Sequence, residues 1–196
     1  MARRLIVGLG NVGREYDFTR HNVGFFILDA LACDNGLVWS LDKKHEAFVA
    51  KWQYKNDIIF LAKPTTFMNL SGRAVASLCK YYKILNEDII VVYDDIAFHV
   101  GDVRVCLRDG CGGHNGVADV LAKVGGGFTR FRIGIGSKPT KQMDLKDYVL
   151  NKFSQDEMKI LEGRMPEILE YLKLLLDKNS KDDINPTNRD KSYGGN

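Results

Sequence analysis

Short apolar runs alternate with amphipathic stretches along the chain, and this alternation predicts the secondary structure. Leu5-Ile6-Val7 and Ile89-Ile90-Val91-Val92 have the composition of strands that are buried on both faces of a sheet. The segments on either side of Lys55-Asn56 predict a hairpin. Strands are therefore expected over residues 5–7, 46–54, 57–62, 88–93, 103–107 and 130–136.

Apolar residues at helical spacing predict helices over residues 22–35, 71–83, 115–123 and 155–176. Asn22 stands at the N-cap position of the first helix. Gly163 and Pro166 are expected to break or kink the last helix. Strands that alternate with helices, together with one hairpin, predict an α/β fold. We expect a single three-layer α/β/α domain with a mixed, mostly parallel sheet that is covered by helices on both faces.

The chain has 196 residues, of which 45% are hydrophobic and 27% are charged, as in an ordinary globular domain. We place this domain at residues 1–178 and expect the mostly polar residues 179–196 to form a flexible tail. No apolar run reaches the length that crosses a membrane, and the chain turns at Gly8 before a signal-type apolar region develops. A cytoplasmic protein without a membrane partner is expected.

Positive charge is concentrated in one part of the sequence. Residues 101–141 carry +4, which leaves −1 on the rest of a chain whose net charge is +3. Residues 128–141 contain four basic residues and no acidic one. A local cationic surface attracts phosphate backbones, although many ordinary surfaces carry similar charge. Nucleic acid is therefore a candidate partner.

Two cofactor classes can be set aside. The four cysteines form no CxxC pair and no histidines have the spacing of zinc ligands, so we expect no metal. The sequence from Gly8 to Gly13 matches GxGxxG, but the helical pattern starts only after Arg20, whereas a dinucleotide-binding helix begins at the glycines. The nearest acidic residue for a ribose, Asp29, lies inside the first predicted helix. No cofactor is expected.

Polar side chains follow several predicted strands at the point where each strand ends. Asn11 follows the first strand, Asn69 lies between a strand and a helix, Asp94-Asp95 ends the run that starts at Ile89, and His114-Asn115 opens the next helix. Open α/β sheets bind ligands outside the carboxyl ends of their strands. We therefore expect these residues to meet in one crevice, although each asparagine alone is equally compatible with a turn or a helix cap.

Histidine precedes asparagine twice, at His21-Asn22 and His114-Asn115, in polar stretches flanked by glycine. Histidine exchanges protons near neutral pH, whereas a pair of surface or capping residues is the alternative. There is no Gly-x-Ser-x-Gly elbow and no cysteine beside a histidine, so no covalent nucleophile is evident. A histidine acting on water, a carboxylate that orients it and amides that hold an acyl group predict hydrolysis of an activated acyl bond such as an ester.

Five motifs make the chain resemble the bacterial-type peptidyl-tRNA hydrolase family. They are the segment 5–24 (similar to GLGNPG…Y…TRHN.G), KPTTFMNLSG at 63–72, residues 92–95, GGHNG at 112–116 and RFRIGIG at 130–136. They occur in order and at family-like spacing between Arg4 and Leu176. The resemblance implies a monomeric, metal-independent enzyme that hydrolyses the ester between peptide and tRNA, and so recycles tRNA from peptidyl-tRNA released prematurely by ribosomes.

The resemblance also implies a role for each matching residue. His21 is the general base that activates water, Asp94 orients it, and Asn11 positions the substrate, water or oxyanion together with Asn69. Asn115 is implied to hold the peptide or the 3′ end, and Tyr16 and Met68 to line the cleft. Arg132 is implied to bind the 5′ phosphate of tRNA. Within the His-Asn pairs, Asn22 is expected to close a helix and His114 to shape its loop.

Three departures from the family pattern concern tRNA binding more than chemistry. Val12 replaces the usual proline after Asn11, and Ala97 with His99-Val100 replaces an Asp-Leu-Pro run. Cys106 stands at a position that is often basic, so Arg132 has less help in binding phosphate unless Arg104 or Arg108 substitutes.

Two other functions compete with hydrolysis: an RNA-binding protein that has lost catalysis, and an oxidoreductase with a nucleotide cofactor. The first has little reason to keep all the polar residues named above, and the second would show saturable binding of NAD.

Overall fold

The computed structural model describes residues 1–107 and 110–177, whose strands form one seven-stranded sheet in the order β2-β3-β4-β1-β5-β7-β6. The strands are β1 (Arg3–Gly8), β2 (Ser40–Asp42), β3 (Ala47–Tyr54), β4 (Asp57–Pro64), β5 (Ile89–Asp95), β6 (Val103–Cys106) and β7 (Thr129–Gly134). The central strands β4, β1, β5 and β7 pair in parallel, whereas β2, β3 and β6 add antiparallel pairings at the edges. The predicted mixed sheet is confirmed, with its parallel part in the centre.

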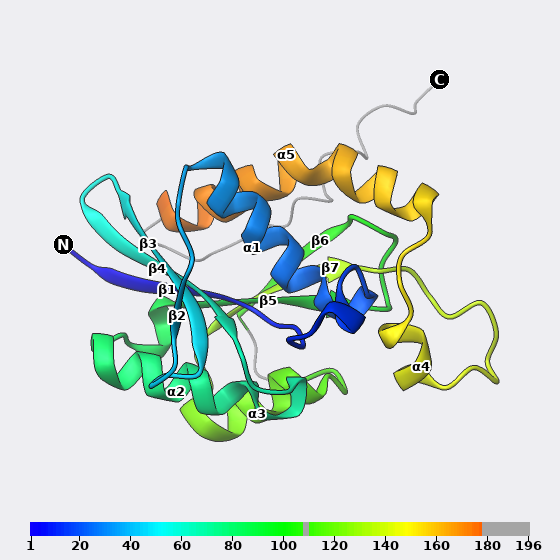
Figure 1. Cartoon of the computed structure of the whole chain (residues 1–196), viewed down its shortest axis with the longest axis horizontal. Helices are drawn as coiled ribbons and strands as arrows, with labels where there is room; N and C mark the ends of the chain where they lie inside the picture. Colours follow the sequence, from blue (N-terminus) through cyan, green and yellow to red (C-terminus); the bar gives the residue numbers. More distant parts are fainter. Residues whose placement is uncertain (108–109, 178–196) are drawn as a thin grey trace.

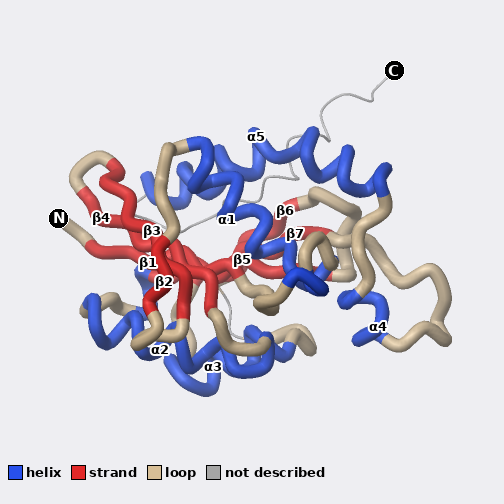
Figure 2. Tube along the Cα trace, viewed as in Figure 1, coloured by secondary structure: helices blue, strands red, loops and turns tan. Residues whose placement is uncertain are grey.

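Helices cover both faces of this sheet (Figure 1). The helices are α1 (Val23–Asp34), α2 (Ser71–Tyr82), α3 (Asn115–Val124), α4 (Leu145–Leu150) and α5 (Gln155–Asp177), with the short turns η1 (Arg14–Tyr16), η2 (Arg20–Asn22), η3 (Met68–Leu70) and η4 (Asn86–Asp88). Helices α1 and α5 lie on one face and α2 and α3 on the other, while α4 lies beyond one end of the central strands (Figure 2). None of the described helices has the length and apolarity needed to cross a membrane.

The apolar core has two parts because consecutive side chains of a strand point to opposite faces. In β5, Ile90 and Val92 pack with α1 and α5, whereas Ile89 and Val91 pack with α2 and α3. All four side chains are buried, as the continuous apolar run predicts. The three-layer arrangement follows directly from this double-sided strand pattern.

The local structure departs from the sequence pattern at several points. Helix α5 runs without a break through Gly163 and Pro166, so the predicted break is absent, whereas a kink there stays a prediction. A proline removes one backbone donor, and the buried residues on both sides of it, such as Leu161 and Leu172, pack in the same core and hold the helix together. Strand β2 and helix α4 were not predicted, because each is too short to show periodicity. The polar tail 179–196 and Arg108 lie outside the described residues.

Two glycines bring α2, α3 and η3 into close contact. A Cβ on Gly72 would lie 2.2 Å from the carbonyl oxygen of Asp119, so only glycine permits this helix crossing. The Gly72 N–H donates to the Asp119 carboxylate at 2.8 Å. A Cβ on Gly116 would lie 2.5 Å from the sulfur of Met68. The start of α3 is therefore packed directly on η3, which carries Asn69.

Candidate active site

A cavity of about 1000 Å³ opens where the central parallel strands end. All eight residues that the sequence singled out line it, namely Asn11, Tyr16, His21, Met68, Asn69, Asp94, Asn115 and Arg132. They come from the loop after β1, from the turns η1, η2 and η3, from the end of β5, from the start of α3 and from β7. Leu145 and Val149 of α4 form part of the opposite wall. The predicted crevice at the strand ends is therefore present.

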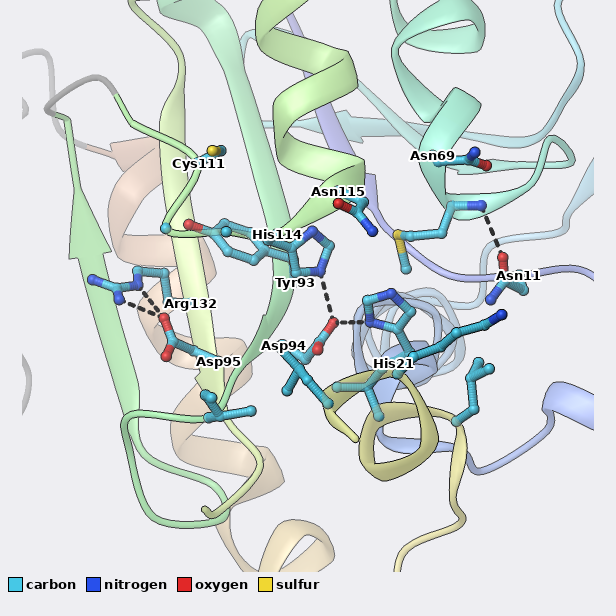
Figure 3. Close-up of a pocket in the computed structure, with 18 of the residues that line it drawn as sticks. Asn11, His21, Asn69, Tyr93, Asp94, Asp95, Cys111, His114, Asn115 and Arg132 are labelled. Carbon is cyan, nitrogen blue, oxygen red and sulfur yellow. Dashed lines mark hydrogen bonds and ion pairs between the residues drawn. The ribbon is translucent and has the colours of Figure 1, made fainter. Parts of the chain in front are cut away.

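Two histidines share one carboxylate oxygen at the centre of this cavity (Figure 3). His21 Nδ1 lies 2.8 Å from Asp94 Oδ1, and His114 Nε2 lies 2.9 Å from the same atom. Asp94 is buried, and the side chains of His21 and His114 are largely covered. The imidazole rings are 4.9 Å apart between centroids. The aspartate that contacts His21 is therefore Asp94 and not its neighbour Asp95.

The hydrogen bonds assign the protons on both rings. A carboxylate only accepts hydrogen bonds, so His21 Nδ1 and His114 Nε2 must both be the donors to Asp94. His114 Nδ1 then carries a lone pair, in agreement with the Val117 N–H that donates to it at 3.2 Å. In neutral His21 the remaining nitrogen, Nε2, is unprotonated and can accept a proton. His21 is therefore held in the tautomer that a general base requires.

The environment keeps Asp94 ionised. Burial alone would raise the pKa of its carboxyl, but the charges and hydrogen bonds of His114 and His21 outweigh burial and hold that pKa well below its usual range. Asp94 therefore stays negative at neutral pH. A fixed negative charge beside His21 favours the imidazolium that forms when this ring takes up a proton.

Asn11 is buried and presents one side of its amide to the cavity. Its Oδ1 accepts the backbone N–H of Met68 at 2.8 Å, which fixes the orientation of the side chain. The Nδ2 donors of Asn11 then lie on the side that faces His21 (Figure 3). A carbonyl oxygen bound between these donors and His21 would be polarised by the amide.

The remaining polar side chains surround this centre. Asn69 and Asn115 are exposed at the cavity wall, on η3 and at the first position of α3 respectively. Met68 is buried and contributes apolar surface, and Tyr16 is half-buried at the end of η1. Amide groups that are exposed on a rigid wall can bind a substrate without first breaking an internal hydrogen bond.

Arg132 lies to one side of the centre, near the β6 edge (Figure 3). Its guanidinium forms an ion pair with Asp95 at 2.5 Å and contacts the sulfur of Cys106 at 3.8 Å. It also lies over the ring of Phe98 at 4.9 Å, and Arg104, its register partner on β6, lies over the same ring at 5.3 Å. Two guanidinium groups therefore flank one aromatic ring beside the cavity.

The structure extends one sequence-based interpretation and corrects another. His114 does more than shape its loop, because it caps α3 and also donates to Asp94. The repeated His-Asn pair was the signal in the sequence that could have indicated a functional role for His114. Asn22 occupies the N-cap position of α1 but makes no cap hydrogen bond with its side chain. It bonds to the backbone of Asn11 instead, because η2 already continues into α1 and leaves the Asn22 amide pointing at the loop after β1.

His21, Asp94 and His114 are also the three described residues whose side chains could together hold a metal ion. A metal on His114 Nε2 would require a proton on Nδ1, which already faces the Val117 N–H donor. A metal on His21 Nδ1 would likewise move the proton of this ring to Nε2 and remove the base. The hydrogen bonds therefore favour proton transfer over metal binding at this cluster.

Arg20 links η2, which carries His21, to α4 and to the segment that follows α4. Its guanidinium donates to both oxygens of Glu157, at 2.9 and 2.7 Å, and to the Lys152 carbonyl at 2.8 Å. It also lies 4.6 Å from the ring centre of Tyr148 in α4. Burial works against the charge of Glu157, but hydrogen bonds from the Ser154 backbone and from Arg20 outweigh it and lower the pKa of Glu157.

Glu157→Gln is expected to lower the free energy of unfolding by about 1 kcal/mol at pH 7, the value allowed for a partly solvated ion pair. A lowered pKa means that this stabilisation is present above the unfolded pKa of about 4.5 and is lost as pH falls through the folded value. Urea unfolding of both proteins at pH 7 and below pH 4 should show the difference shrinking in acid. Glu167→Gln, at an exposed pair on the same helix, is the control and should change little. A constant difference at both pH values would contradict this account.

A histidine held by a buried carboxylate, beside amide donors in the same cavity, is an arrangement that can activate water for hydrolysis. Comparison with known proteins then identifies the family. The sequence profile described as peptidyl-tRNA hydrolase matches residues 5–194. The chain belongs to the peptidyl-tRNA hydrolase family.

Several relatives cover almost the whole chain. The peptidyl-tRNA hydrolase of Lachnoclostridium phytofermentans is 42% identical over 94% of this chain and 96% of its own length. That of Methylococcus capsulatus is 44% identical over 88% of this chain and 92% of its own. The crystal structure of peptidyl-tRNA hydrolase from Acinetobacter baumannii superimposes with a TM-score of 0.83 at 36% identity, covering 89% of this chain and 88% of that one. The family resemblance inferred from the motifs is confirmed.

Proposed function

We propose that this protein hydrolyses the ester that joins a peptide to tRNA, and so frees tRNA from peptidyl-tRNA released prematurely by ribosomes. The observation that carries this proposal is His21, held by Asp94 with Nε2 unprotonated, in a cavity that also contains the amide of Asn11. Membership of the peptidyl-tRNA hydrolase family supplies the substrate class.

The reaction is one addition and one elimination. His21 Nε2 takes a proton from water while the water oxygen attacks the ester carbonyl carbon, and Asp94 stabilises the resulting imidazolium. The Nδ2 donors of Asn11, with those of Asn69 or Asn115, stabilise the negative charge on the carbonyl oxygen. The bond from carbon to the ribose oxygen then breaks, and the imidazolium returns its proton to that oxygen. The products are a free peptide carboxyl group and tRNA with a free hydroxyl.

Arg132 and Arg104 are proposed to bind a tRNA phosphate beside this centre. Two guanidinium groups on neighbouring strands suit the bidentate recognition of phosphate oxygens. Arg104 thereby supplies the second positive charge that Cys106 lacks. Asp95 neutralises part of the charge on Arg132, so Arg132 must loosen its ion pair with Asp95 to bind phosphate fully. The enzyme is further proposed to act as a monomer in the cytoplasm, where peptidyl-tRNA is made.

Hydrolysis should show a tRNA-dependent advantage that salt removes. The purified protein is expected to cleave N-acetylaminoacyl-tRNA at low salt far faster than a short N-acetylaminoacyl ester without the tRNA body. The advantage should fall steeply with salt because phosphate contacts release counterions. Binding of the tRNA substrate without cleavage would favour the competing RNA-binding function and overturn the proposal.

Arg132→Ala is expected to raise KM for the tRNA substrate about 10-fold at low salt, since one phosphate contact is lost. The slope of log affinity against log salt should become shallower by about one. Cleavage of the short ester should be unchanged. Arg73→Ala is the matched control, because Arg73 pairs with Glu46 away from the cavity. Equal losses on both substrates would contradict a phosphate-binding role for Arg132.

A further inference from the structure

Asn22 makes a pair of hydrogen bonds with the backbone of Asn11. Its Oδ1 accepts the Asn11 N–H at 2.9 Å, and its Nδ2 donates to the Asn11 carbonyl at 2.8 Å. Both residues are buried, with exposed fractions of 6% for Asn22 and 7% for Asn11. Two antiparallel hydrogen bonds between planar groups fix both position and rotation, so the amide of Asn22 holds Asn11 in one orientation.

This pair is the first part of a chain of contacts that reaches the cavity. Asn22 ends η2, one residue after His21, and thereby links the base to the loop after β1. The Asn11 side chain passes the constraint to η3 through its bond to the Met68 N–H at 2.8 Å. The loop needs such a constraint because Val12, which follows Asn11, lacks the ring that restricts the φ angle of proline.

We infer that Asn22 is a positioning residue for ester hydrolysis, which aims the Nδ2 donors of Asn11 at the reacting carbonyl. This inference rests on the proposed function. Asparagine is the side chain of this length that offers a donor and an acceptor in one plane, as both backbone groups of Asn11 require. Aspartate keeps the acceptor but, when ionised, turns an oxygen toward the Asn11 carbonyl. Glutamine has the right groups on a stem that is one methylene too long.

The test is Asn22→Asp, assayed with N-acetylaminoacyl-tRNA between pH 5.5 and 8.5. At the alkaline end, kcat should fall about 30-fold with little change in KM, because the donors of Asn11 matter chiefly in the transition state. A protonated carboxyl regains a donor hydroxyl. The ratio of variant to wild-type kcat should therefore rise as the pH falls. A purely structural role would produce a pH-dependent ratio only where the variant unfolds.

Two controls separate positioning from loss of folding. Asn35→Asp makes the same change at the other end of α1, where Asn35 Nδ2 donates to the Leu31 carbonyl at 2.8 Å, and it should leave kcat unaltered. In an Asn11→Ala background, Asn22→Asp should cost little further kcat, because the group that it positions is gone. Thermal unfolding at each pH shows whether the variant is folded where it is assayed.

The outcomes distinguish the two proposals. If wild-type protein does not cleave the substrate, the proposed function fails. If wild type cleaves it and Asn22→Asp matches wild type at every pH, the positioning role fails while the function stands. Additive losses with Asn11→Ala, or a kcat loss that tracks the unfolded fraction, would also overturn the positioning role. Faster exchange of the Met68 amide hydrogen in the folded variant would support it independently of activity.

Discussion

Replacing His21 with alanine is expected to lower kcat for peptidyl-tRNA by at least about 10³-fold, within the range for loss of a general base. The variant keeps the cavity, but no other described side chain presents an unprotonated imidazole nitrogen beside Asn11. His114 cannot substitute, because one of its nitrogens donates to Asp94 and the other accepts from Val117. Single-turnover cleavage of N-acetylaminoacyl-tRNA measures the effect.

His99→Ala is the matched control for this experiment. His99 is exposed on the loop after β5 and does not line the cavity, so its loss should leave kcat near the wild-type value. The circular dichroism spectrum and the unfolding transition of His21→Ala should match those of the wild type. A well-folded His21→Ala protein with near-full activity would exclude the mechanism proposed here.

Asp94→Asn is expected to reduce kcat by about 10³-fold, because a neutral amide cannot stabilise the imidazolium of His21. If the new amide nitrogen faces His21 Nδ1, it also forces that nitrogen to be an acceptor and puts the proton on the catalytic Nε2. Asp95→Asn is the control, since Asp95 contacts Arg132 and not His21. It should change KM for tRNA rather than kcat. Similar kcat losses in both variants would rule out a special role for Asp94.

Asp94→Asn also changes how the free energy of unfolding depends on pH. The pKa of Asp94 is lowered in the folded protein, so its charge contributes stability above the unfolded pKa of about 4, and this contribution is lost as pH falls through the folded value. Asp94→Asn has no such titration. The gap in unfolding free energy between wild type and variant should therefore narrow in acid.

The sheet and its two covering layers were predictable because the apolar runs are continuous. A run such as 89–93 has no polar face, which requires cover on both sides. The cavity was predictable for a related reason, since the candidate side chains follow strands whose carboxyl ends converge. The order of the strands in the sheet was not predictable, because the position of β1 between β4 and β5 depends on contacts between distant segments.

Contacts between side chains were the part that the sequence could not supply. The bond from His114 to Asp94 spans 20 residues and depends on how the loop after β6 returns to β5. Asn22 was misjudged because its position before a helix favours capping, whereas the neighbouring loop offered two buried backbone groups that needed partners. Helix α4 has six residues, so burial of Tyr148 and Val149 was visible only in the folded structure.

The close packing at Gly72 and Gly116 has a consequence for motion during turnover. Because α2, α3 and η3 touch with no room for a Cβ, the wall that carries Asn69 and Asn115 can shift only as one unit. The facing wall, α4, is a single short helix held by its buried side chains Tyr148 and Val149 and by the contact of residues 151–153 with residues 18–20. Any opening that admits a bulky substrate is therefore expected to move α4 rather than the wall of α2, α3 and η3. The amides of Asn69 and Asn115, which must hold one geometry, thus lie on the tightly packed wall of the cavity. Substrate and products are expected to pass on the side of α4.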